Sequence, residues 1–284
     1  MARDYEPWAV SGFSGVLALD ELYDGFVVLV ATDPLNDKTI SVRLCKSATE
    51  EQLIKFLRHL KKIGVNPAVI VTDGSPLYQE IPRRIWPKAK HQLCIFHYTR
   101  LLTARVFDAL RDLRRFFKKA EESRAYARLL WDNRYLFVTR PEHLSDAQRK
   151  VLDGLCERHG TVKAVREFMV KSFALFDRGQ TREEALAKRE ELVANPVYRF
   201  SFPLHKAIHS LRPYQFVRAI TFLDYENCPR TTNHVERANR YYRKRAKSHY
   251  RNRTKRAIWN MVKSDLMVRK VGHSCEDSVT LRAL

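Results

Sequence analysis

The sequence has little glycine or proline, few cysteines and no long hydrophobic run. Its 284 residues include 9 Gly, 11 Pro and 5 Cys, with no internal repeat and no Gly/Ser-rich or Pro-rich linker. This composition excludes collagen-like, low-complexity and disordered chains. The cysteines are odd in number and widely scattered, which argues against a disulfide framework and for a reducing, intracellular setting.

Membrane insertion is also excluded by what the sequence lacks. The longest apolar run near the start is Phe26–Ala31, far below the ~20 residues that a helix needs to cross a bilayer. The first ten residues, MARDYEPWAV, contain no apolar segment of the kind that a signal peptide requires. We therefore expect no signal peptide and no membrane partner.

Acidic residues are scarce relative to basic ones. The chain has 52 Lys and Arg against 32 Asp and Glu, a formal net charge of +20. This excess favours a polyanionic partner, nucleic acid first and an anionic membrane surface second. About half of it lies in residues 230–256, where Glu236 is the only acid. Tyr241, Tyr242 and Tyr250 alternate with the cations there, which indicates a nucleic-acid-binding surface, with a merely solvated face as the alternative.

The first hundred residues predict a mixed sheet with helices packed on it. Apolar, β-branched runs predict strands at 13–20, 26–32, 39–44, 68–72 and 89–94. The first two strands are expected to form a hairpin. Thr49 is expected to cap a helix, and a short helix is expected around 75–85. The apolar positions of the first helix recur with helical spacing at Leu53, Phe56, Leu57 and Leu60.

From about residue 96 to 224 the pattern is helical throughout. One apolar stripe comprises Leu101, Leu102, Val106, Leu110 and Leu113. Further helices are expected at 121–135, 145–158, 161–176, 181–193 and 205–219, and a last long one from about 233 to 268. The chain is thus expected to be an α/β protein with a large all-helical insertion. We place the insertion at 99–226, between the two parts of the core at 1–98 and 227–284.

Two acids are expected at the ends of neighbouring strands. Asp20 ends the first expected strand and Asp73 directly follows the fourth. Functional groups collect outside strand ends in α/β sheets, although a single acid there is often only a turn residue. Two carboxylates in one crevice repel each other unless a proton or a cation neutralises them. Hard divalent ions such as Mg²⁺ or Mn²⁺ suit such a pair, and two of them ~4 Å apart suit phosphodiester chemistry.

Glu236 is the candidate for a third carboxylate. If its helix docks on the sheet, this side chain can face Asp20 and Asp73. A structural alternative exists, because Asn233 and Glu236 have the spacing of a capping box. Arg240, four residues further on, could also pair with Glu236 on the helix surface.

Four motifs in this order resemble those of the DDE transposases, especially the Mutator-like branch and its bacterial insertion-sequence relatives. They are Asp20 in ALDELYDG, Asp73 in VIVTDGSPLY, Cys94 and His97 in HQLCIFH, and Glu236 in TTNHVERANRYYRKR. The resemblance extends from about residue 13 to 262. It implies a ribonuclease-H-like core, a mixed sheet with flanking helices, and an all-helical insertion before the helix that carries Glu236.

The resemblance also implies a reaction and its partners. Asp20, Asp73 and Glu236 would be the catalytic residues and would hold two Mg²⁺ (or Mn²⁺), with no small-molecule cofactor. The family cleaves the 3′ ends of a transposon with water and then joins the freed 3′-OH to target DNA, both by in-line phosphoryl transfer. DNA is then the partner, bound by a homodimer. The location is cytoplasmic, associated with the nucleoid in a prokaryote.

Further site residues follow from the same motifs. In the family the C-x-x-H pair lies near the active site, so Cys94, His97 and Asn233 are expected to support it. A structural zinc would need a second pair of ligands. The expected DNA-binding residues are His234, Arg237, Arg240, Arg243, Lys244, Arg245, Lys247, Arg251 and Arg253.

Three further residues have structural rather than catalytic interpretations. Asp33 is followed by Pro34 and Asn36 and is expected to be a turn residue. Glu21 should face away from Asp20, because side chains alternate along a strand. Trp131 is expected in the core, although an aromatic residue of the insertion can stack on a distorted base in related transposases.

One feature departs from the family pattern. Only 19 residues precede Asp20, too few for the N-terminal DNA-binding module that these transposases usually carry. The alternatives are a catalytic fragment, a truncated copy, or a transposase that finds its ends through the insertion. Two rival functions share the motifs in part: a ribonuclease-H-like nuclease or resolvase, and a non-enzymatic DNA-binding protein derived from a transposase.

Overall fold

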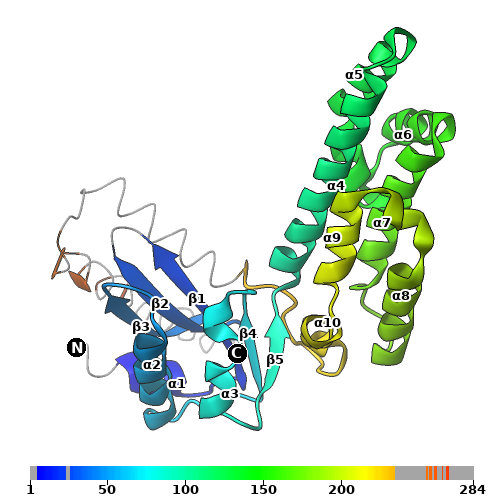
Figure 1. The fold of residues 1–284 in the computed structure, drawn as a ribbon. Coiled ribbons are helices and arrows are strands. Elements are labelled where there is room, and N and C mark those ends of the chain that lie inside the picture. The colour runs from blue at the N-terminus through cyan, green and yellow to red at the C-terminus, as the bar shows by residue number, and fades with distance from the viewer. Residues whose placement is uncertain are drawn as a thin grey trace, which may run out of the picture. The chain divides into compact units, whose positions relative to one another are not determined.

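The computed structural model describes residues 5–23 and 26–233, and eight positions between 254 and 268. The chain divides into two compact units. The sheet unit contains the residues up to Cys94 together with those from Asn227 onward, and the helical unit is Ile95–Glu226 (Figure 1). None of the described helices has both the length and the apolar character needed to cross a membrane.

A five-stranded mixed sheet forms the sheet unit, in the order β3-β2-β1-β4-β5. The strands are β1 (Val16–Tyr23), β2 (Val27–Asp33), β3 (Lys38–Cys45), β4 (Val69–Thr72) and β5 (Lys90–Leu93). The first three are antiparallel neighbours, whereas β4 pairs in parallel with both β1 and β5. The predicted α/β class and the hairpin of the first two strands are confirmed.

The predicted end of the first strand is wrong. We placed that end at Asp20, but β1 continues to Tyr23. The reason is the hairpin: Asp20, Glu21 and the next two residues all pair with β2, as far as Tyr23 opposite Val27. Asp20 therefore lies inside a strand, at the level where the shorter neighbour β4 has already ended.

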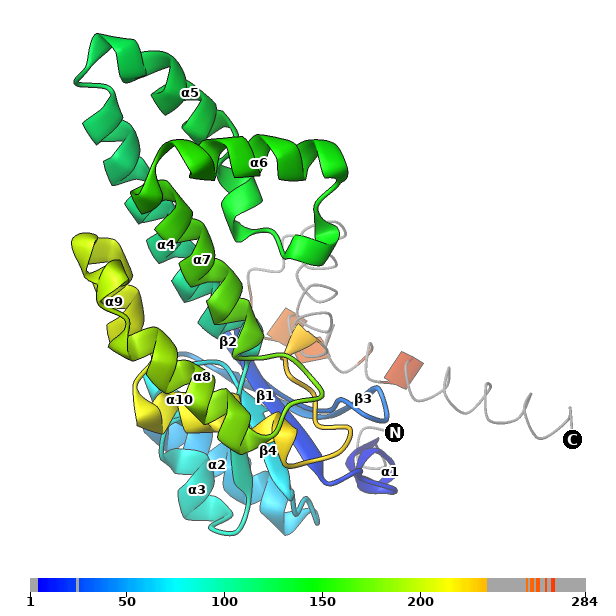
Figure 2. The same cartoon turned by 90° about the vertical axis from the view of Figure 1, so that its right-hand side faces the viewer.

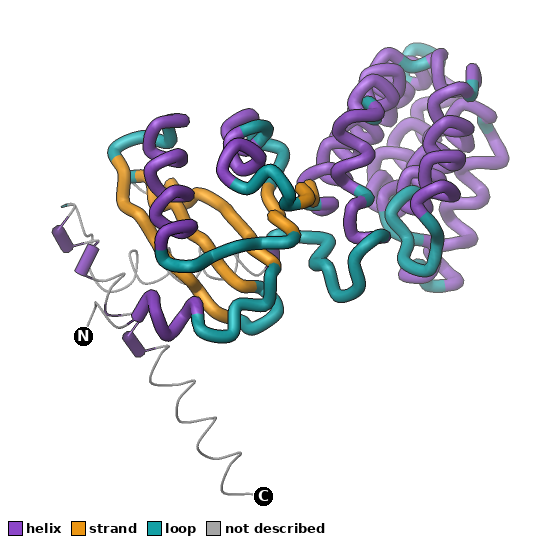
Figure 3. The backbone as a smooth tube through the Cα atoms, turned by 90° about the horizontal axis from the view of Figure 1, so that it is seen from below, coloured by secondary structure: helices purple, strands orange, loops and turns teal. Residues whose placement is uncertain are grey.

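Helices on one face of the sheet enclose the main core. After α1 (Tyr5–Val10) and the first three strands, α2 (Glu50–Lys62) and α3 (Ile81–Ile85) lie side by side on this face (Figure 3). Thr49 caps α2 as predicted, and its hydroxyl accepts a hydrogen bond from the backbone N–H of Gln52. The predicted stripe of α2 is almost fully buried and contacts Leu17, Leu19 and Ile70 of the sheet.

The structure describes every residue of the helical unit, and these residues form seven α-helices. They are α4 (Ile95–Phe117), α5 (Arg124–Asp132), α6 (Asp146–Arg158), α7 (Gly160–Ala174), α8 (Arg182–Ala194), α9 (Phe202–Ser210) and α10 (Pro213–Ala219). The long helix α4 packs against α5, α7 and α9 (Figure 2). No strand is present between residues 95 and 226, as predicted.

Two helix predictions need correction. The single helix expected at 205–219 is divided into α9 and α10, because Pro213 has no N–H for a helical hydrogen bond and instead begins a new helix. The last helix, expected from 233 to 268, lies mostly outside the described residues. Thr254 lies in a bend and its hydroxyl accepts from the N–H of Ala257, so a helix does not run unbroken through this position.

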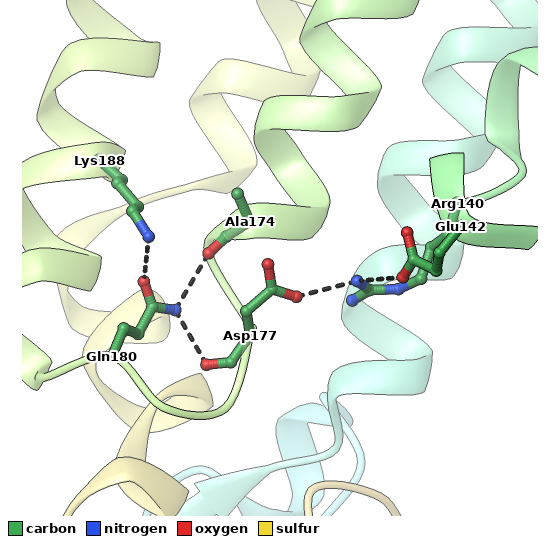
Figure 4. A network of polar contacts seen from close by, with 6 residues as sticks. All are labelled: Arg140, Glu142, Ala174, Asp177, Gln180 and Lys188. Atoms are coloured by element: carbon green, nitrogen blue, oxygen red, sulfur yellow. Dashed lines mark hydrogen bonds and ion pairs between the residues drawn. The ribbon is translucent and has the colours of Figure 1, made fainter.

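Polar contacts hold the loop between α7 and α8 (Figure 4). The amide of Gln180 donates to the carbonyl oxygens of Ala174 and Asp177, at 3.0 and 3.1 Å. Lys188 on α8 donates to the same side chain at 2.7 Å, and Arg140 forms a 2.9 Å ion pair with Asp177. The Gln180 bonds satisfy the carbonyl group of Ala174, the last residue of α7, and that of Asp177 in the loop.

Arg166 of α7 is a buried arginine with a similar role. Its Nη1 donates to the carbonyl oxygens of Leu136, Phe137 and Thr139 at 3.2, 3.0 and 2.7 Å. These carbonyls lie at and beyond the end of the 3₁₀ helix η4 (Arg134–Val138). Burial lowers the pKa of Arg166. The side chain thus joins η4 to α7.

Replacing Arg166 with methionine should destabilise the helical unit. The variant keeps an apolar stem but leaves three carbonyl groups without this donor, so we expect the free energy of unfolding to fall by about 2–4 kcal/mol. Urea unfolding followed by circular dichroism measures it. Arg128→Met is the control, because Arg128 is 87% exposed and should contribute less than about 0.5 kcal/mol. Equal losses in both variants would contradict the assigned role.

Candidate active site

The parallel pairing of β1 with β4 brings Asp20 and Asp73 to the same level of the sheet. Ala18 is opposite Val71 in this pair. Continued by two residues, the same register sets Asp20 opposite Asp73. Asp73 directly follows β4, as predicted, and both carboxylates are partly exposed.

The two carboxylates belong to the face of the sheet opposite to α2 and α3. Side chains alternate along strands, and Leu17 and Leu19 of β1 lie in the core beneath those helices. Asp20 is therefore on the other face, and the shared register places Asp73 with it. Two like charges on adjacent strands repel each other, which makes this position costly without a cation.

Local backbone contacts orient both carboxylates. Asp73 Oδ1 accepts a hydrogen bond from the N–H of Ser75 at 2.9 Å, and Ser75 in turn caps the short 3₁₀ helix η2 (Pro76–Tyr78). Asp20 Oδ1 accepts from the N–H of Glu21 at 2.9 Å. Such bonds limit the rotamers of a carboxylate without neutralising its charge.

Thr72 and His91 brace the backbone beside Asp73. The buried Thr72 hydroxyl donates to the carbonyl oxygen of Asp73 at 2.8 Å and lies 2.7 Å from His91 Nε2. A hydroxyl has a single proton to donate, so the network assigns the donor role in the second contact to Nε2 of the imidazole. This contact joins β5 to the end of β4.

Cys94 connects the strand ends with the segment that leads to Glu236. Its N–H donates to the carbonyl oxygen of Thr72 at 2.8 Å, and its buried Sγ accepts from both the N–H and the hydroxyl of Thr232, each at 3.3 Å. Asn233 follows at once, with an exposed side chain and helical backbone. The chain is thus held beside β4 and β5 four residues before Glu236.

Of the remaining predicted site residues, His97 is the one that lies within the described ranges. His97 lies on α4 in the helical unit, partly buried, with its ring edge-on to Phe96. Within the described ranges, no three His, Cys, Asp or Glu side chains are grouped closely enough to hold a metal ion. The predicted third carboxylate and the predicted DNA contacts lie outside those ranges. These are Glu236, His234, Arg237, Arg240, Arg243, Lys244, Arg245, Lys247, Arg251 and Arg253.

Asp33 is a structural acid. It is fully buried, and its carboxylate accepts hydrogen bonds from the N–H and hydroxyl of Ser14 at 2.8 and 2.6 Å and from the amide of Asn36 at 2.8 Å. The bond from Asn36 closes the turn after β2, and those from Ser14 join this turn to the segment before β1. Its interpretation as a turn residue is confirmed.

Besides Thr72 and Ser75, the residues near the candidate site that were not assigned from the sequence include Thr232 and Tyr78. The buried hydroxyl of Tyr78 donates to the carboxylate of Glu21. Burial, followed by the charges of Glu21, Asp20 and Asp73, raises the pKa of Tyr78 well above its usual value. From the sequence, Tyr78 and Thr232 could be recognised only as members of the VIVTDGSPLY and TTNHVER motifs. A motif does not reveal which distant residues its side chains contact.

The comparison with protein families identifies the class of this protein. A family model for transposases, of the ISL3 type of DDE transposase, matches residues 24–212. Because this is about two thirds of the chain, the protein belongs to that family. It is a DDE-type DNA transposase of the insertion-sequence kind, and DNA is its substrate.

The match has limits within the chain. Asp73, Cys94 and His97 lie inside the matched range, whereas Asp20 and Glu236 lie outside it. ISL3 is a family distinct from the Mutator-like branch, so the finer part of the predicted resemblance is not confirmed. No curated protein matches the chain.

Replacing Cys94 with alanine should destabilise the sheet unit. The N–H and hydroxyl of Thr232 would lose an acceptor in a buried place, so we expect a loss of about 1–3 kcal/mol in the free energy of unfolding. The matched control is Cys156→Ala, because Cys156 is only partly buried and should cost less than about 1 kcal/mol. Urea unfolding followed by circular dichroism would measure both losses. An unchanged free energy of unfolding in the Cys94→Ala variant would contradict the contact with Thr232.

Proposed function

We propose that the chain is the catalytic region of this transposase, with Asp20, Asp73 and Glu236 as its three acidic residues. In this proposal the protein cleaves the 3′ ends of its element and transfers the freed strands to target DNA, each by in-line phosphoryl transfer. The observation that carries it is the register of β1 and β4, which pairs Ala18 with Val71 and, continued by two residues, sets Asp20 opposite Asp73.

We propose further that the sheet unit is a ribonuclease-H-like core. Its support is the sheet order β3-β2-β1-β4-β5, in which three antiparallel strands are followed by two parallel ones. The helical unit is inserted between β5 and the segment that leads to Glu236. The closer likeness to the Mutator-like branch stays a proposal that rests on the C-x-x-H and TDG motifs.

The donor set suits hard divalent cations. Asp20 and Asp73 offer carboxylate oxygens, the ligands that Mg²⁺ and Mn²⁺ prefer, and the contact of Cys94 with Thr232 holds nearby the segment that supplies Glu236. We propose two Mg²⁺ (or Mn²⁺) at these three residues. When bound, Mg²⁺ supplies Lewis-acid stabilisation of the attacking and leaving oxygens.

The chain's own residues then have positional tasks. Ser75 N–H and Glu21 N–H fix the rotamers of the two carboxylates. Thr72 and Cys94 hold the ends of β4 and β5. Preorganised ligands of this kind lose little entropy when substrate arrives, which favours the chemical step.

DNA contacts are proposed for both units. The basic stretch from His234 to Arg253 supplies many cations. In the helical unit, the guanidinium groups of Arg114 and Arg134 lie over the ring of Trp131, with Cζ 4.9 and 4.7 Å from its centroid. Tyr135, 59% exposed, also stacks with Arg134. Cations interleaved with aromatic rings are typical of surfaces that hold DNA strands.

The assembly and the location are proposed on family grounds. Transposases of this class act on paired DNA ends, so we propose a homodimer on DNA, in the cytoplasm of a prokaryote and associated with its nucleoid.

Nicking of supercoiled plasmid in the presence of Mg²⁺ or Mn²⁺ tests the proposed active site. Asp73→Asn removes one charge with little change in volume, and we expect it to lower the nicking rate by at least about 10²-fold. Glu51→Gln is the control, because Glu51 is 70% exposed on α2 and should leave the rate unchanged. Equal rates for wild type and Asp73→Asn would contradict the assignment. Joining of cut ends to target DNA would separate a transposase from a nuclease.

Binding of DNA should depend strongly on salt. Each phosphate neutralised contributes about −0.9 to the slope of log affinity against log salt concentration, so a chain with this charge should show a slope of several units. Fluorescence anisotropy of a labelled duplex, titrated between low and moderate salt, measures the slope. A slope near zero would exclude a basic DNA-binding surface.

A further inference from the structure

A hydrogen bond on the core side of the sheet connects β1, which carries Asp20, with η2, the short 3₁₀ helix that begins three residues after Asp73. Its donor is the hydroxyl of Tyr78 in η2, and its acceptor is the carboxylate of Glu21, the residue after Asp20. Tyr78 is 1% exposed and packs in the core with Leu19. Glu21 faces this core because side chains alternate along β1, as expected.

The position of this bond matters because the strand pairing ends before the carboxylates. The last pair of residues between β1 and β4 is Ala18 with Val71. β4 itself ends at Thr72, so Asp73 lies just outside the strand. The bond from Tyr78 to Glu21 joins β1 to η2, the element that follows β4 and Asp73 in the chain.

A short chain of contacts connects this bond with both carboxylates. On one side, Asp73 accepts from Ser75 N–H, and the carbonyl oxygen of Ser75 accepts from Tyr78 N–H at 3.1 Å. On the other side, Glu21 N–H donates to Asp20 at 2.9 Å. Each step involves adjacent or nearly adjacent residues, so movement of the tyrosine relative to Glu21 would alter the spacing of the carboxylates.

We propose that Tyr78 and Glu21 form a positioning pair that sets the separation of the Asp20 and Asp73 carboxylates for binding divalent metal. This inference rests on the proposed function. Two carboxylates at one level of the sheet repel each other, and the tie opposes their separation when metal is absent. The raised pKa of Tyr78 keeps its hydroxyl protonated and available as a donor.

The test compares metal binding and activity in variants of the 284-residue chain. Tyr78→Phe keeps the ring and its packing but removes the donor. The control is Tyr126→Phe, because the Tyr126 hydroxyl is also buried and donates to the carbonyl oxygen of Leu155 at 2.7 Å, within the helical unit. Calorimetric titration with Mn²⁺ measures affinity, and plasmid nicking across a Mg²⁺ series measures the metal concentration for half-maximal rate.

We expect Tyr78→Phe to weaken Mn²⁺ binding by about tenfold or more, as loss of partners of metal ligands commonly does. The Mg²⁺ concentration for half-maximal nicking should rise by the same factor, and the rate should recover at saturating metal. Tyr126→Phe should lose similar thermal stability without a change in metal affinity. Glu21→Ala removes the same bond from its other side, so the double variant should bind Mn²⁺ no more weakly than either single variant.

Each contrary result has a distinct meaning. Mn²⁺ binding that depends on Asp73 but is unchanged in Tyr78→Phe and Glu21→Ala would overturn the positioning role alone. Additive losses in the double variant would also overturn it, because the two residues would then act independently. If wild type shows no Mn²⁺ binding that Asp73→Asn removes, the proposed function fails and this inference fails with it.

Discussion

The parallel pairing of β1 with β4 is the constraint on which the rest of the sheet unit depends. Parallel neighbours require a long crossover between them. Here that crossover contains β2, β3 and α2, and its helix supplies the apolar stripe that covers one face of the sheet. The same pairing aligns Asp20 with Asp73, although many residues separate them in the sequence. The core and the candidate site are thus consequences of one strand register.

The two faces of the sheet have different tasks. The face beneath α2 and α3 is apolar and contains the tie from Tyr78 to Glu21 at its edge. The opposite face carries Asp20 and Asp73. Carboxylates gathered at one place are unfavourable for folding without a cation. Apolar residues are nevertheless buried on both faces: Val28 and Val30, on the same face as Asp20, are 4% and 0% exposed. This burial lets a costly charge arrangement persist at the site.

The helical unit relies on buried polar contacts as well as apolar packing. Arg166 and the network around Gln180 satisfy carbonyl groups at helix ends, where the helix itself has no donors. A rigid unit of this kind can present cations and aromatic rings, such as Arg134 and Tyr135, at defined positions. Family membership adds the function, since the ISL3 transposase match covers most of this unit.

The sequence by itself determined the features that depend on local pattern. The strands, the capped helix α2 and the turn at Asp33 follow from hydrophobic periodicity and turn chemistry, which act over a few residues. The motifs also identified the family of DDE transposases. Pro213 is a recognisable helix-breaking residue in the sequence. The apolar pattern nevertheless continues across it, and for that reason we expected one helix instead of α9 and α10.

Only the tertiary structure decided which distant residues meet. The extension of β1 past Asp20 depends on how far β2 pairs with it, and no local pattern encodes that length. The contacts of Tyr78 with Glu21 and of Thr232 with Cys94 join residues far apart in the chain. They exist because one register, rather than another, minimises the exposed apolar surface of the whole sheet, and that choice is made by packing, not by local sequence.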